Sequence, residues 1–341
     1  MKTKQLTNRD IQLAAELLRS GGLVGIPTET VYGLGANALD PDAVSRIFVA
    51  KGRPQDNPLI IHIPAADWID RYCVDVPQSA RILADRFWPG PMTMVLPRAA
   101  VVPDVVTAGL DTVGVRCPGH ELCRQIIEQA GVPVAAPSGN TSGRPSPTTA
   151  QHMLEDMDGK IDAIVDGGPC DVGVESTIID LTGDVPRLLR PGGITLEQLE
   201  AVLGQVEVDP AVTRSMKKGE KPRAPGMAYR HYAPKAPVTV VSGDPEASAN
   251  YILGHIQPGE GVICFDDQAG LFAHMIPAHH TVRLGVSTDK AEQARHLFDA
   301  LRTFDHTEVT AIWAQCPDNG GIGLAVVNRL SKAAGFHIIE L

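Results

Sequence analysis

The sequence predicts an α/β protein built from two domains, and three observations lead to this prediction. Short apolar runs typical of buried strands alternate with helix-like runs along the chain. The 341 residues are enough for two domains with cores of their own. A segment rich in proline, glycine and cations, residues 208–236, separates two acidic regions. We therefore expect one domain over residues 1–207 and a second over 237–341.

The N-terminal region mixes helices and strands less regularly than the rest of the chain. An amphipathic helix is predicted over residues 8–20, and a Gly-Gly pair stops it. Asp40 and Pro41 are typical of the cap and first turn of a second helix, which should end at Gly52. The predicted strands of this region are LVGIP, PLIIHIP, MTMVLP, TVGVRCP, VPVAAPS, DAIVDGG, STIIDL and RLLRPG.

The C-terminal region alternates more cleanly. Its clearest helix is predicted over residues 289–304, where apolar residues recur every three or four positions. Strands that alternate with helices predict a mostly parallel, doubly wound sheet. The run GGIGLAVVNRL lacks the full glycine spacing of a dinucleotide-binding loop. The predicted strands are residues 237–242, 261–265, 281–286, 309–314 and 336–341.

Composition excludes several classes of protein. The chain is 43% hydrophobic and 21% charged, as soluble globular proteins are. Its start has no signal-peptide core, and no apolar run approaches the roughly 18 residues of a membrane span, so we expect a cytoplasmic protein without a membrane partner. The six cysteines form no CxxC pair, which argues against a disulfide framework or a structural zinc site.

The net charge of −10 is unevenly distributed along the chain. Residues 1–207 carry −9 and residues 237–341 carry −6, whereas residues 208–236 carry +5. A nucleic-acid-binding face normally appears as a basic patch, so both acidic regions argue against RNA binding. The basic segment has the composition of a solvated hinge, but its rings, Tyr229, His231 and Tyr232, argue against a simple spacer.

Candidate binding residues lie in loops beside the predicted strands. No GxxxxGK[ST] loop is present, and polar residues interrupt the strand that should precede GLGANA, so a standard nucleotide fold is not indicated. Lys51 and Arg53 offer a compact charge and a planar fork for phosphate, and SGNTSG offers backbone N–H groups. Arg116 and Arg190 could clamp a carboxylate or phosphate. Taken singly, each feature is also typical of a solvated ion, a turn or a core residue.

The order of the motifs along the chain is more informative than any single motif. The chain contains PTETVYGLG, KGRPQDNPLIIHI, WPGPMTMVL, GVRCP, APSGNTSGRPSPT, ESTIIDL, RLLRPGGI and APGMAYRHYAP. This set resembles the threonylcarbamoyl-AMP synthase family in its long form. The resemblance implies a YrdC-like domain with a twisted mixed α/β sheet, joined to a smaller, Rossmann-like C-terminal domain.

The resemblance also implies an activity. Members of this family make threonylcarbamoyl-AMP and pyrophosphate from L-threonine, bicarbonate and ATP, with Mg²⁺ expected, and their product goes to a transferase complex that modifies tRNA. Direct tRNA binding is left open. An RNA-binding or ATP-binding regulatory module of the same class without catalysis is the alternative. A carbamoyl transferase with zinc fingers is excluded by the cysteine pattern.

Matching the family's motifs assigns roles to individual residues. Lys51 and Arg53 would stabilise the transferring phosphate, and residues of 208–236 would close over the nucleotide as a lid. No protein side chain is assigned to a metal. ATP would be held by Lys51, Arg53, Asn57, Thr112, Ser138, Asn140, Ser146, Arg190 and Tyr232, and L-threonine by Thr30, His62, Arg116, Ala136 and Ser176.

Overall fold

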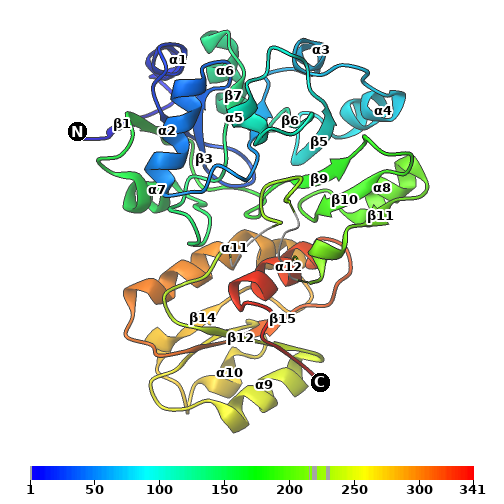
Figure 1. The fold of residues 1–341 in the computed structure, drawn as a ribbon. Coiled ribbons are helices and arrows are strands. Elements are labelled where there is room, and N and C mark those ends of the chain that lie inside the picture. Colours follow the sequence, from blue (N-terminus) through cyan, green and yellow to red (C-terminus); the bar gives the residue numbers. More distant parts are fainter. Residues whose placement is uncertain (1, 215, 217–220, 228–230) are drawn as a thin grey trace. The chain divides into compact units, whose positions relative to one another are not determined.

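The computed structural model describes residues 2–214, 216, 221–227 and 231–341 (Figure 1). The chain forms two compact units. The first unit is Met1–Ser142 with Ser146–Ala228, and the second is Gly143–Pro145 with Tyr229–Leu341. Among the described residues, no helix is both long and apolar enough to cross a membrane.

The first unit is built on one mixed sheet. Its eleven strands run in the order β1-β8-β2-β3-β7-β4-β6-β5-β9-β10-β11. Parallel pairs such as β4 with β6 stand beside antiparallel pairs such as β5 with β6, which confirms the expected mixed sheet. The strands are β1 (Lys4–Leu6), β2 (Val24–Ile26), β3 (Gly33–Asn37), β4 (Ile60–His62), β5 (Met92–Pro97), β6 (Thr112–Arg116), β7 (Val134–Ala135), β8 (Ala163–Val165), β9 (Thr177–Asp180), β10 (Arg187–Arg190) and β11 (Glu207–Val208). The helices are α1 (Ile11–Arg19), α2 (Pro41–Lys51), α3 (Ile69–Tyr72), α4 (Gln78–Phe87), α5 (Asp104–Thr107), α6 (Glu121–Ala130), α7 (Ala150–Met157) and α8 (Leu196–Leu203).

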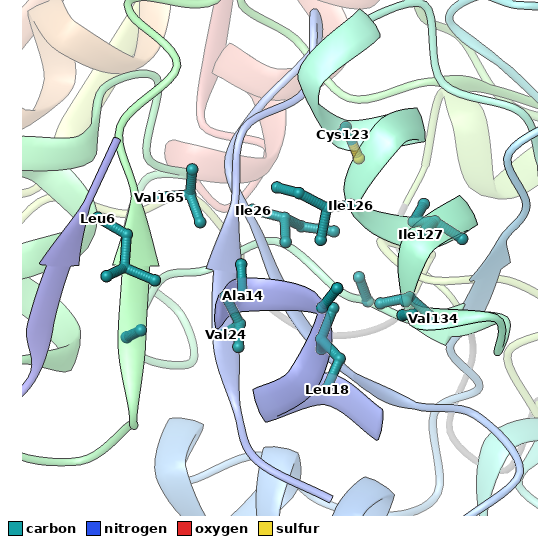
Figure 2. Packing of buried hydrophobic residues seen from close by; sticks show 14 residues of the cluster. Leu6, Ala14, Leu18, Val24, Ile26, Cys123, Ile126, Ile127, Val134 and Val165 are labelled. Carbon is teal, nitrogen blue, oxygen red and sulfur yellow. The ribbon is translucent and has the colours of Figure 1, made fainter. Parts of the chain in front are cut away.

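Helices α1 and α6 cover one part of this sheet. Figure 2 shows Leu18 of α1 and Ile126 of α6 packed with Val24 and Ile26 of β2, and all four side chains are fully buried. Burial of each such side chain contributes roughly 1.5–3 kcal/mol to stability. This cluster fixes the strand that leads into the PTET motif.

Helix α2 begins and ends as the sequence predicts. Asp40 caps it by accepting the backbone N–H groups of Asp42 and Ala43 at 3.0 and 3.1 Å. Gly52 ends it with a φ of 63°, in the left-handed region that favours glycine. These two signals place Lys51 in the last turn of the helix.

The strand β3 was not predicted. Its sequence, GLGAN, lacks the β-branched residues typical of strands, and GLGANA resembles a loop motif. Small residues are needed there, since a Cβ on Gly35 would come within 2.8 Å of Val134 Cγ1 on the neighbouring β7. Close approach of side chains across the sheet therefore explains the glycines.

The second unit contains a five-stranded parallel sheet in the order β14-β13-β15-β12-β16. Its helices lie on both faces, α9 and α10 on one and α11 and α12 on the other (Figure 1), which confirms the doubly wound prediction. The strands are β12 (Val238–Ser242), β13 (Gly261–Cys264), β14 (Thr281–Arg283), β15 (Ile312–Cys316) and β16 (Ile338–Glu340). The helices are α9 (Pro245–His255), α10 (Ala269–Phe272), α11 (Lys290–Thr303) and α12 (Gly323–Ala333).

Three residues of the SGNTSGRPSPT loop, Gly143–Pro145, belong to this second unit. Arg144 forms an ion pair with Asp305 at 3.0 Å between Nη2 and Oδ2. The other oxygen of Asp305 accepts the backbone N–H of Lys235 at 2.8 Å. Arg302, which is 2% exposed, donates from Nη2 to the carbonyl of the third loop residue at 2.6 Å. These contacts hold the loop segment in a defined conformation.

The basic segment 208–236 is partly packed. Ala211, Ala224 and Met227 are buried in the first unit, against a cluster that includes Ile60 of β4 and Ile178 of β9. The three residues therefore cover one face of the first sheet.

The aromatic residues of the segment have different positions. Tyr229 lies outside the described residues. Tyr232 belongs to the second unit, where it is 4% exposed and its ring lies 5.2 Å from that of Phe298.

Candidate active site

Three neighbouring strands of the first unit place polar side chains in one row. His62 of β4 lies opposite Arg116 of β6, and Arg116 lies opposite Thr93 of β5. Residues directly opposite each other on adjacent strands project from the same face of a sheet. Ile60 and Val95, on the same face of β4 and β5, belong to a buried apolar cluster, so the polar groups beside them mark the candidate site.

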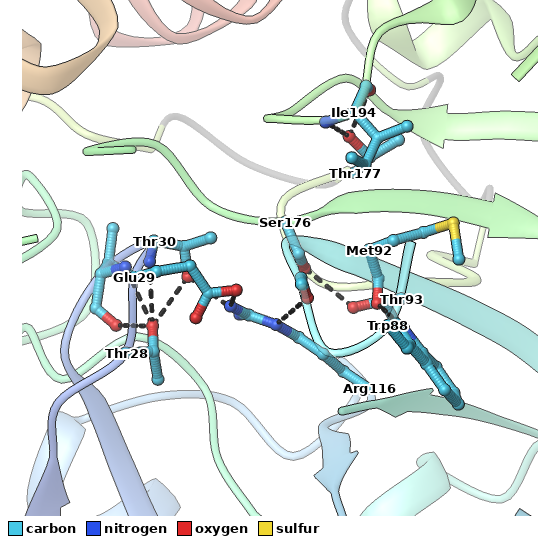
Figure 3. Close-up of polar contacts among 12 residues, drawn as sticks. Thr28, Glu29, Thr30, Trp88, Met92, Thr93, Arg116, Ser176, Thr177 and Ile194 are labelled. Atoms are coloured by element: carbon cyan, nitrogen blue, oxygen red, sulfur yellow. Dashed lines mark hydrogen bonds and ion pairs between the residues drawn. The ribbon is translucent and has the colours of Figure 1, made fainter. Parts of the chain in front are cut away.

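Arg116 is the centre of the row. Its side chain is 4% exposed, and Nη2 lies 2.7 Å from Glu29 Oε1. Nη1 donates to Thr30 Oγ1 at 2.8 Å, and Nε approaches the carbonyl of Gly90 at 3.4 Å. Figure 3 shows Arg116 reaching toward both Glu29 and Thr30. Because a guanidinium carries five N–H groups, each terminal nitrogen retains one N–H beyond these contacts.

Glu29 is a buried anion. The residue is 8% exposed, and burial alone would raise the pKa of its carboxyl. The positive charge of Arg116 and a hydrogen bond from Gly119 outweigh burial, so the pKa lies below its usual value. Glu29 and Arg116 therefore form a buried ion pair with no net charge.

The hydroxyl groups of the PTET motif are ordered by a short hydrogen-bond chain. Thr28 Oγ1 donates to the carbonyl of Val31 at 2.7 Å, so Thr30 must donate in its 2.8 Å contact with Thr28. The Thr30 oxygen also accepts from Arg116. These hydrogen bonds fix the orientation of the Thr30 hydroxyl group.

His62 is neutral in this site. Burial, and then the charge of Arg116, lower its pKa to about 3. Nδ1 lies 3.2 Å from the carbonyl of Ile60, which favours the tautomer protonated at Nδ1. His62 can therefore contribute shape and hydrogen bonding but no positive charge at neutral pH.

Ser176 connects this row with Arg190, one of the residues predicted to bind ATP. Its Oγ lies 2.8 Å from Thr93 Oγ1, and Arg190 Nη2 donates to the same oxygen at 3.1 Å. Arg190 Nε also donates to the Ser176 carbonyl at 3.0 Å. Ser176 was predicted to bind threonine and Arg190 to bind ATP, so one hydrogen-bonded network contains members of both sets.

Lys51 holds the SGN loop. It is 2% exposed, and its ammonium group donates to the carbonyls of Ser138 and Asn140. The amide of Ser142 returns a hydrogen bond to the Lys51 carbonyl at 2.9 Å. The structure therefore brings three of the predicted ATP-binding residues together, with Lys51 at the end of α2 in contact with Ser138 and Asn140 of the loop.

Arg53 stabilises the turn that follows α2. Its Nη2 donates to the carbonyls of Asn57 and Pro58, both at 3.2 Å. Asn57 is 3% exposed, and its side-chain oxygen has no hydrogen-bond donor among the described residues. A buried amide oxygen in this state needs a partner outside the described protein atoms, such as ordered water, an ion or a ligand.

The remaining predicted residues occupy separate places in the first unit. Ser146 is fully buried and donates to Glu175 Oε1 at 2.5 Å. Ala136 lies just after β7 and donates its N–H to the carbonyl of Ile60 at 3.0 Å. Thr112 begins β6 and is half-buried.

Sequence reasoning missed several polar residues of the network. Glu29, Thr93 and Glu175 were not assigned a role, although each belongs to a motif that was noted. A signal did exist for Thr93, because a polar residue interrupts the apolar strand MTMVLP. The partner of Glu29 could not be predicted, since the pair depends on long-range folding.

The described residues offer no cluster of three or more histidine, cysteine, aspartate or glutamate side chains that could hold a metal ion.

Two family models match the chain in succession. The model described as "Telomere recombination" matches residues 16–192, and the model described as "Threonylcarbamoyl-AMP synthase, C-terminal domain" matches residues 194–335. Together they cover nearly the whole sequence.

Full-length relatives agree with these matches. A threonylcarbamoyl-AMP synthase of Pyrococcus abyssi is 50% identical, over 97% of this chain and 96% of its own. One from Bacillus subtilis is 46% identical, over 99% and 97%. The crystal structure of P. abyssi Sua5 complexed with L-threonine covers all of both chains with a TM-score of 0.89 and 46% identity.

Proposed function

This chain belongs to the threonylcarbamoyl-AMP synthase family, and we propose that it forms threonylcarbamoyl-AMP and pyrophosphate from L-threonine, bicarbonate and ATP. One observation of the structure supports the proposal most directly. Arg190 donates two hydrogen bonds to Ser176, so a residue predicted for ATP touches one predicted for threonine. An enzyme that joins these two substrates needs such adjacency.

The amino-acid half of the site is the row around Arg116. Arg116 is suited to a substrate carboxylate, because each of its terminal nitrogens retains an N–H in a fixed plane. Thr30, His62, Ala136 and Ser176 would shape the space for the threonine side chain. His62 contributes as a neutral ring.

The nucleotide half is centred on Lys51 and Arg53. When a polyphosphate breaks between its α- and β-phosphorus atoms, negative charge builds on the phosphate oxygens, and fixed cations stabilise that charge. Lys51 keeps the SGN loop in place, so its charge and the loop amides form one unit. Asn57, Thr112, Ser138, Asn140, Ser146 and Arg190 complete the proposed ATP-binding set.

The proposed chemistry requires positioning more than proton transfer. The amine of threonine takes up bicarbonate with loss of water, and an oxygen of the resulting carbamate attacks the α-phosphorus as pyrophosphate leaves. Holding the carbamate and the phosphate in line supplies much of the rate enhancement. Mg²⁺ bound to the phosphates would neutralise further charge.

The context of the reaction also belongs to the proposal. The adenylate product would pass to a transferase complex that modifies tRNA in the cytoplasm. Residues 208–236, with Tyr232, would close over the nucleotide. The burial of Ala211, Ala224 and Met227 against the first sheet favours a segment that is held by the first unit at these positions. The hypothesis of a non-catalytic RNA-binding or ATP-binding module gains no support from the named relatives.

The experiment that tests the function follows pyrophosphate. Purified protein is incubated with ATP, Mg²⁺, bicarbonate and L-threonine, and pyrophosphate release is compared with a reaction that lacks threonine. We expect release only when threonine is present, together with a product of the mass of threonylcarbamoyl-AMP. Release that is independent of threonine, or none, would contradict the proposed function.

A further inference from the structure

The ion pair between Glu29 and Arg116 leaves the amino-acid half of the site without net charge. Both side chains are nearly buried, with exposed fractions of 11% and 4%. His62, opposite Arg116 on the next strand, is neutral, and Thr30 and Ser176 carry no charge. The neighbouring charges also have opposite signs, since Glu175 precedes Ser176 in the chain and Arg190 donates to it.

Buried ion pairs are expensive to keep. Removal of two charges from water costs free energy, and their mutual attraction offsets this cost only when the geometry is good and further hydrogen bonds are made. An arginine alone would be the simplest group to hold a carboxylate, and it would be satisfied once the ligand bound. Besides its ion pair with Arg116, the Glu29 carboxylate accepts a hydrogen bond from the backbone of Gly119, so its position in the site is fixed. The presence of a second charge beside Arg116 still calls for an explanation in terms of the ligand.

Selection between ligands does explain it. In a site of low polarity, the attraction of Arg116 for a substrate carboxylate is opposed by repulsion from Glu29. A simple carboxylate anion therefore gains little from entering. An α-amino acid also brings a positive amine, which Glu29 attracts, so the zwitterion is favoured over the anion.

We propose that Glu29 is a specificity-determining residue, which makes the site select a zwitterionic amino acid and reject the corresponding deaminated acid. This inference rests on the proposed function for the identity of the amino acid. Glu29 sets the charge of the site and orients Arg116, and it takes no part in bond making or breaking. Discrimination then arises from a repulsive element as well as from attractive contacts.

The test measures binding without ATP by isothermal titration calorimetry. The two ligands are L-threonine and 3-hydroxybutanoate, which keeps the hydroxyl and carboxylate groups but lacks the amine. For Glu29→Gln we expect L-threonine to bind at least tenfold more weakly and 3-hydroxybutanoate at least threefold more tightly. Glu29→Asp keeps the charge and should keep the preference for L-threonine.

The opposite directions of these two changes separate charge selection from a structural role. If Glu29 merely held the site together, both ligands would weaken by a similar factor, and that result would overturn the proposal. Unchanged binding of both ligands would also overturn it. Asp70→Asn is the matched control, because it removes a carboxylate from an exposed ion pair with Arg81 and should change neither affinity.

If Glu29→Gln fails to fold, the proposal can still be tested with the unmodified protein. In the unmodified protein, 3-hydroxybutanoate should bind at least a hundredfold more weakly than L-threonine, and affinities within threefold of each other would contradict the proposal. Pyrophosphate release tests the proposed function separately. If the protein makes the adenylate but binds L-threonine and 3-hydroxybutanoate equally well, the proposed role of Glu29 is wrong and the proposed function stands.

Discussion

At the scale of single residues, the two cations of KGRPQDN have different structural duties. Lys51 is buried and binds two carbonyls of the SGN loop, whereas Arg53 is half-buried and binds carbonyls of its own turn. Loss of Lys51 would leave two loop carbonyls without their donor, and each such loss costs roughly 1–3 kcal/mol. The two residues should therefore respond differently to substitution.

We expect Arg53→Ala to reduce turnover at least a hundredfold while the midpoint of thermal unfolding changes by less than about 2 °C, because a fixed cation that stabilises transition-state charge contributes on this scale. Lys51→Ala should reduce both turnover and the unfolding midpoint. Pyrophosphate release and differential scanning fluorimetry measure the two effects. Near-normal turnover of Arg53→Ala would show that its role was wrongly assigned.

His62 gives a prediction for stability against pH. Its pKa is about 3 in the folded protein and about 6.5 when unfolded, so the unfolded chain takes up a proton first as pH falls. The contribution of His62 to stability is complete above pH 6.5 and is lost progressively below it, by about 1.4 kcal/mol per pH unit. Other histidines, and glutamates near pH 4.5, titrate in the same interval, so the contribution of His62 is taken as the difference from a variant that lacks it.

The measurement compares unfolding midpoints across that interval. We expect the midpoint of the unmodified protein to fall more steeply than that of His62→Gln, by about 3–5 °C per pH unit for a unit of this size. His274→Gln, at an exposed histidine, is the control and should keep the original slope. Parallel slopes for all three proteins would mean that folding does not lower the pKa of His62.

At the scale of helices and strands, local signals were sufficient where they were strong. Asp40-Pro41 and Gly52 defined α2, and the apolar run MTMVLP coincides with β5. The strand β3 was missed because its glycines serve close packing against β7, a relation that local sequence does not record. Propensity scales describe single segments, whereas this strand depends on its neighbours.

The candidate site shows the same division. Motif order indicated Arg116 and His62, but only the pairing of β4 with β6 places them opposite each other. The partnership of Glu29 with Arg116 joins a turn after β2 to the end of β6, and nothing in either segment specifies the other. The identity of the site residues could be predicted from the sequence. The pairs that determine their charge state, such as Glu29 with Arg116, could be found only in the folded structure.

At the scale of the whole molecule, the loop SGNTSGRPSPT draws on both units. Ser138, Asn140 and Ser146 belong to the first unit, and Gly143–Pro145 belong to the second by their contacts. In the second unit, Asp305 pairs with Arg144 and accepts the N–H of Lys235. Because Gly143–Pro145 lie in the chain between Asn140 and Ser146, contacts that hold these three residues reduce the conformations open to the proposed ATP-binding residues on either side.

This connection predicts a role for the second unit in nucleotide binding. Asp305→Ala removes the partner of Arg144, so the loop gains conformational freedom that ATP binding must then remove. We expect the KM for ATP to rise at least fivefold, with a smaller change in the KM for L-threonine, both measured by pyrophosphate release. Asp318→Ala is the matched control, because it breaks the Lys290 ion pair of the same unit and should leave both constants unchanged. Equal KM values for ATP in Asp305→Ala and the unmodified protein would mean that the loop is ordered without the second unit.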